Sequence, residues 1–166
     1  MLFSKKGETD TIYTVNIPTN HALILYRLVR EETDKHKAEF TMKQKEVLTA
    51  LTQRAYDDRE AEKRLFEIQD DLMTLIRLES LIWNEYVRKH EFYTITELNM
   101  LELDIPSKAY KLIMSILHRK IEEMTEKQLE YLNKNFRKPD RLHDYLESIN
   151  RLVELKGYFE DVKNSL

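Results

Sequence analysis

The side chains with the clearest potential for chemistry are cations in the second half of the chain. If the stretch from Ser107 to Lys120 is helical, one of its faces carries Lys108, Lys111, Ser115 and Arg119. A second basic cluster contains Lys134, Arg137 and Lys138. Cations in such groups can contact phosphates, and a nearby serine can reach base edges. These residues therefore form a candidate face for binding DNA or another macromolecule.

The stretch 94–120 also has the capping residues and the proline-containing turn of a helix-turn-helix. Thr94 and Glu97 form a capping box, which predicts a helix to about Glu102. A turn over 103–106 would follow, because the residue before Pro106 is disfavoured in helical space, and Ser107 is a good N-cap for the next helix. The first helix would be acidic, however, and the net charge is −3. We therefore favour a structural hairpin, with a DNA-binding transcriptional regulator as the alternative.

Acidic residues suggest a second alternative. Glu122, Glu123 and Glu126, followed by Glu147, resemble the pattern of the all-α nucleoside-triphosphate pyrophosphohydrolases, in which carboxylates on two helices hold magnesium. The resemblance implies a magnesium-dependent hydrolase, but Asn150 stands where that pattern has an acid. Acid pairs at this spacing are also typical of solvated helix faces.

Composition excludes several other kinds of site. The chain has 166 residues and no cysteine, which excludes disulfides, cysteine-based zinc sites and thiol nucleophiles. Its five histidines show no i, i+4 ligand pair, and two glycines are too few for a phosphate-cradling loop. We therefore expect no enzyme activity, no cofactor and no metal. No apolar run reaches the length of a membrane span, so we expect a cytoplasmic protein without a membrane partner.

The apolar pattern predicts one all-α domain over 1–166, a bundle of about five to seven helices with a flexible tail at 1–10. Residues 11–17 alternate as a strand does, and we expect them to pair with 91–95 or with a second chain. Between Met42 and His90 there is no glycine or proline. This favours one long helix, straight or kinked, over two helices that turn near 57–59.

Helix boundaries are also marked by single residues. Thr41 and Thr125 are candidate new starts within longer helical patterns. Pro139 or Asp140 is expected to begin the last helix, and Gly157 to end it.

Trp83 and Tyr86 lie in a segment whose apolar residues nearly encircle the helix. We expect them in the core or, where this segment is exposed, at a protein interface. The sequence predicts a non-enzymatic interaction protein that acts through its helical surface on a protein partner or as a homo-oligomer, with a dimer possible. Small lysine- and glutamate-rich chains of this type resemble accessory and host-interaction proteins of bacteria and their phages.

Overall fold

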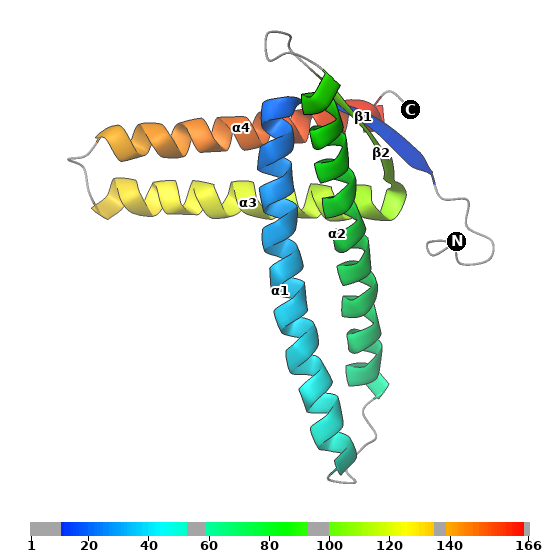
Figure 1. Ribbon diagram of the computed structural model, residues 1–166. Coiled ribbons are helices and arrows are strands. Elements are labelled where there is room, and N and C mark those ends of the chain that lie inside the picture. The colour runs from blue at the N-terminus through cyan, green and yellow to red at the C-terminus, as the bar shows by residue number, and fades with distance from the viewer. Residues whose placement is uncertain (1–10, 53–58, 93–99, 135–138, 165–166) are drawn as a thin grey trace.

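A computed structural model describes residues 11–52, 59–92, 100–134 and 139–164. Within these ranges the chain forms four helices and two strands, in the order β1 (Ile12–Pro18), α1 (Thr19–Thr52), α2 (Arg59–Phe92), β2 (Met100–Pro106), α3 (Ser107–Lys134) and α4 (Pro139–Asn164). Figure 1 shows two helical hairpins, α1 with α2 and α3 with α4, that lie across each other. The small sheet lies near the region where they cross, which we call the crossing.

The sheet joins segments that are almost ninety residues apart. β1 and β2 pair antiparallel, with Ile12 opposite Pro106 and Val15 opposite Leu103. Both strands alternate buried and exposed side chains, as a sheet with one covered face requires. The backbone amide of Ser107 donates to the carbonyl of Thr11 at 2.9 Å, so the start of α3 is tied to the start of β1.

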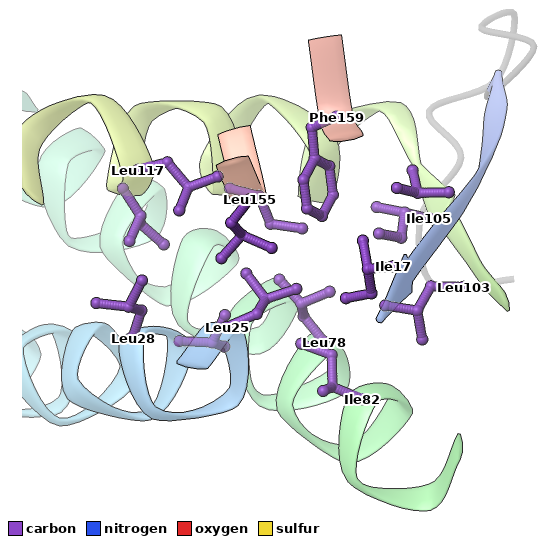
Figure 2. Close-up of a cluster of buried hydrophobic side chains, with 14 of the residues drawn as sticks. Ile17, Leu25, Leu28, Leu78, Ile82, Leu103, Ile105, Leu117, Leu155 and Phe159 are labelled. Atoms are coloured by element: carbon purple, nitrogen blue, oxygen red, sulfur yellow. The ribbon is translucent and has the colours of Figure 1, made fainter. Parts of the chain in front are cut away.

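The hydrophobic core sits at the crossing. Figure 2 shows side chains from both strands and all four helices that converge there, among them Ile17, Leu25, Leu78, Leu117 and Phe159. Of the side chains described in α1, none beyond Thr33 is buried. The distal arms of the hairpins therefore contribute far less buried apolar surface than the crossing does.

The predicted strand at 11–17 is confirmed, but its predicted partner is wrong. Its partner is β2, a segment that sequence reasoning assigned to a helix end and a turn. The first two residues of the predicted partner, 91–95, belong instead to α2, which continues to Phe92. The reason is visible in β2 itself, where Leu101, Leu103 and Ile105 alternate with acidic residues at a period of two. The rest of the predicted first helix and pairing segment, 93–99, lies outside the described residues.

The predicted mostly helical fold with a minor two-stranded sheet is confirmed, but the prediction of five to seven helices was too high. Thr41 and Thr125 lie inside continuous helices, where each hydroxyl donates to the carbonyl four residues earlier instead of capping a new helix. Gly157 likewise lies within α4, while Pro139 begins α4 as expected. The tail at 1–10 lies outside the described residues.

The preference for one long helix over 42–90 is also wrong. α1 ends at Thr52, α2 begins at Arg59, and the two helices run side by side (Figure 1). Arg64 of α2 donates to Glu39 of α1 at 3.1 Å, which places the second helix back along the first. Apolar stripes on both helices gain more from packing together than a single exposed rod would.

In the described part of the chain, none of the helices combines the length and apolar character needed to cross a membrane.

The core position of β2 can be tested with Leu103→Ala. Leu103 is fully buried, so the truncation should lower the free energy of unfolding by about 2–5 kcal/mol. Chemical denaturation measures this difference. The matched control is Ile12→Ala in the paired strand, which is 62% exposed and should cost less than about 1 kcal/mol. Equal losses in the two variants would contradict the assignment of faces.

Tyr110 provides a test that depends on pH. Its hydroxyl donates to the carbonyl of Phe159 at 2.6 Å, which links α3 to α4. Burial raises the pKa of Tyr110 above its ordinary value, with smaller contributions from Tyr13 and Glu160. Tyr110→Phe should lower the free energy of unfolding by roughly 1–3 kcal/mol at neutral pH.

The sign of the pH effect follows from the raised pKa. The neutral phenol is favoured in the folded protein, so its contribution is complete below the unfolded pKa of about 10 and is lost as pH rises towards the folded value. The difference in unfolding free energy between wild type and Tyr110→Phe should therefore shrink above about pH 10. A difference that grows with pH would contradict this assignment.

Candidate protein-binding surface

The outer face of α2 carries a row of large apolar side chains that are exposed. Phe66 is 59% exposed, Met73 43%, Ile76 37% and Trp83 45%. Their spacing of seven, three and seven residues places them along one side of the helix. We call these four residues the α2 stripe. At about 1.5 Å per residue, it is roughly 25 Å long.

A second apolar row fixes the direction in which the α2 stripe points. Ile68, Leu75, Leu78 and Ile82 are buried, with Leu75, Leu78 and Ile82 in the core at the crossing. Each of the last three lies two residues after a position on the outer face, a rotation of about 200° around the helix. Packing of this inner row therefore holds the α2 stripe on the opposite side of α2.

The centre of the outer face is uncharged. Gln69 and Ser80 are exposed between the apolar residues, and Asp70 and Arg77 flank the stripe on one side. The exposed face of the neighbouring helix is different, because α1 shows a mixture of charges there, including Arg30, Asp34 and Lys37. An uncharged strip with charged edges is the usual composition of a protein interface.

Trp83 and Tyr86 lie at the end of α2 near the crossing. The ring of Trp83 lies 5.1 Å from that of Tyr26 and 6.0 Å from that of Tyr86, measured between centroids. Tyr86 is half-buried against the core, whereas 45% of Trp83 stays exposed. The segment is thus core on one side, and Trp83 presents an aromatic surface whose orientation is fixed by its neighbours.

The basic face of α3 is present, but two of its cations are engaged by carboxylates. Lys108 forms ion pairs with Asp70 and with Asp71 of α2. Arg119 donates to Glu32 of α1 at 2.8 Å. These contacts hold α3 against the first hairpin and offset the positive charge that a phosphate would meet.

The other predicted residues of this kind fall into two groups, two on the same face of α3 and three in the second basic cluster. Lys111 and Ser115 are exposed on α3, and Lys134 is its last residue. Arg137 and Lys138 lie outside the described residues. The structure therefore brings together Lys108, Lys111, Ser115 and Arg119 on one face of α3, while Lys134 lies at the far end of the same helix.

Glu32 is the most buried carboxylate in the described part of the chain, at 6% exposure. Its Oε1 accepts from Arg119 and lies 3.5 Å from His36 Nδ1. A buried carboxylate without a partner is costly, so this contact is structural. Arg119, predicted as an interaction residue, holds α1 and α3 together.

Arg119→Ala tests the structural role of this contact. The truncation leaves Glu32 without its main donor and should cost roughly 1–3 kcal/mol of unfolding free energy. Adding Glu32→Gln should recover part of that loss because the buried charge is removed. Lys111→Ala, on the exposed face of the same helix, is the control and should stay within about 0.5 kcal/mol of wild type. Chemical denaturation of wild type and the three variants measures these differences. An Arg119→Ala variant as stable as Lys111→Ala would show that the contact between Arg119 and Glu32 does not stabilise the fold.

The acidic pattern is not assembled into a metal site. Glu122 pairs with His118, Glu123 with Lys127 at 3.0 Å, and Glu147 with Arg151. The hydrogen bond from Lys127 and the charge of Lys120 lower the pKa of Glu123. Among the described residues, no group of three acidic or histidine side chains is arranged to hold a metal ion. The expectation that the chain has no enzyme activity stays a prediction.

A groove of about 260 Å³ lies between α1, α3 and α4. Leu28, Met124 and Leu152 line it, together with charged side chains of both signs. Glu31 and Lys120 within it lie 3.8 Å apart. The charged lining is cationic on balance, because Arg27, Lys120 and Arg151 outnumber Glu31. Glu147 also holds Arg151 in an ion pair at 2.7 Å.

Phe66, Met73 and Ile76 were missed as functional candidates by sequence reasoning. Their signal is the interleaving of two apolar rows on α2, one of which must remain uncovered if the other forms the core. Burial of the inner row had to be known before the outer row could be recognised.

Comparison with known proteins gives no match, whether to family models, to curated proteins or to solved structures.

Proposed function

We propose that this chain is a non-enzymatic protein-interaction module, and that the outer face of α2 binds another protein or a second copy of the chain. The observation that carries the proposal is the α2 stripe, four large apolar side chains in one row on the outside of the fold. Exposed apolar patches of a few hundred Å² are often functional in soluble proteins. Removing them from water supplies the driving force.

The patch is large enough to form the apolar part of an interface, but not the whole of it. Aromatic side chains cover about 150–250 Å² each when fully buried, so four large side chains about half exposed present on the order of 300–400 Å². A standard interface covers about 800 Å² per partner, so polar flanks must take part. Trp83 suits an anchor residue because its ring is already held by Tyr26 and Tyr86, and little mobility is lost on binding.

DNA binding through 94–120 stays a prediction of the sequence. The described part of that stretch begins as β2 rather than as a leading helix, and Lys108 and Arg119 contact carboxylates. These observations do not favour that alternative over the α2 stripe.

Site-specific photo-cross-linking tests the proposed function. A photoreactive amino acid at Phe66 should give covalent adducts with a protein in the cells from which the chain comes. The control is the same amino acid at Met42 of α1, which is 64% exposed but lies outside the stripe. Mass spectrometry of the adducts identifies either this chain or another protein.

Adducts at Phe66 that are missing at Met42 support the proposed function whichever protein is captured. Equal adducts at both positions, or none at Phe66, Met73 or Ile76, would overturn it.

A further inference from the structure

We infer that the protein bound by the α2 stripe is a second copy of this chain, with the two α2 helices antiparallel and related by a two-fold axis. This inference rests on the proposed function and names the partner. The axis passes between Met73 and Ile76, and it places Phe66 of each copy against Trp83 of the second copy.

The spacing of the stripe is the first argument. Phe66 lies seven residues before Met73, and Trp83 lies seven residues after Ile76. The row therefore reads the same in both directions, and an end-to-end rotation superimposes apolar positions on apolar positions. A two-fold interface requires such self-complementarity.

The contact layers follow from this register. Met73 packs against Ile76 of the second copy, and Gln69 lies opposite Ser80 of the second copy. The large rings of Phe66 and Trp83 meet at both ends of the interface. Every exposed residue at the centre of the face thus meets an uncharged residue, and no charge is buried there.

Charges on the flank give the second argument. Asp70 and Arg77 lie one heptad apart on the same side of the stripe. Antiparallel pairing brings Asp70 of each copy near Arg77 of the second copy, which makes two ion pairs across the axis. Asp70 is 70% exposed on its side chain although it also contacts Lys108, so it can accept a further donor.

In a parallel pair of α2 helices, Asp70 and Arg77 would not face each other across the axis. Such a pair would place Leu65 and Leu72 opposite these charges, and it would gain no ion pair. Charge complementarity fixes orientation and partner choice more than it fixes affinity. The charges therefore favour the antiparallel dimer specifically.

Charge exchange across the axis tests this arrangement. Asp70→Arg and Arg77→Asp should each place like charges opposite each other and weaken self-association roughly tenfold or more. An equimolar mixture of the two variants should form a heterodimer, because each new arginine then meets an aspartate. Sedimentation of wild type, each variant and the mixture over a range of concentrations measures these affinities.

Folding must be monitored because Asp70 also contacts Lys108. Asp71 remains beside Lys108 at 3.5 Å, and circular dichroism of each variant establishes that it is folded. Recovery of association in the mixture supports the inference. Two folded variants that stay monomeric when mixed would overturn it.

Disulfide cross-linking tests the direction of the helices independently. The chain contains no cysteine, so cysteines introduced at Gln69 and Ser80 are the sole thiols. A mixture of Gln69→Cys and Ser80→Cys proteins should cross-link, because the two positions face each other across the antiparallel pair. Each variant alone should not cross-link, since its two thiols lie about 16 Å apart along the helix. Cross-linking of each variant alone and not of the mixture would show a parallel pair and overturn the inference.

The two proposals fail in different ways. A wild-type chain that is monomeric at every concentration overturns self-association. If the photoreactive residue at Phe66 then captures a different protein, the proposed function stands without it. If Phe66, Met73 and Ile76 all capture nothing, both fail.

Discussion

The pairing of β1 with β2 is the contact on which the rest of the structure depends. Each strand leads directly into a helix, β1 into α1 and β2 into α3, so the ladder fixes where both hairpins begin. It also presents Val15, Ile17 and Leu103 to the core at 0% exposure. Two strands alone are marginal in water, and the helices of both hairpins cover the inner face of this sheet.

Concentrating the core at the crossing has a consequence for α2. The helix is buried along one side by the crossing and by α1, yet its apolar residues continue around to the other side. The four residues of that outer row are exposed and do not belong to the core cluster. In the proposed function a second protein surface would cover the outer row and remove it from water, which is the physical basis of that proposal.

Local sequence signals predicted the helical class, the first strand and the start of α4, since caps, prolines and alternation act within a few residues. They failed for β2 because a capping box and a proline turn outweighed a period of two whose partner lies far away in the chain. They also overestimated the number of helices, because Thr41 and Thr125 bond within a helix as readily as they cap one. The stripe on α2 could not be separated from the core in the sequence, since which row is covered depends on tertiary packing. For the basic face of α3, the positions were predictable but the carboxylates opposite them were not.

Oxidative footprinting of the methionines and the tryptophan tests the central claim most directly. Met73 and Trp83 are exposed in the isolated chain, as are Met42 and Met100 outside the stripe. We predict that Met73 and Trp83 are oxidised in dilute purified protein and protected in the cell, while Met42 and Met100 react equally in both. Equal oxidation of Met73 and Trp83 in both settings would show that the outer face of α2 stays uncovered, and would contradict the account.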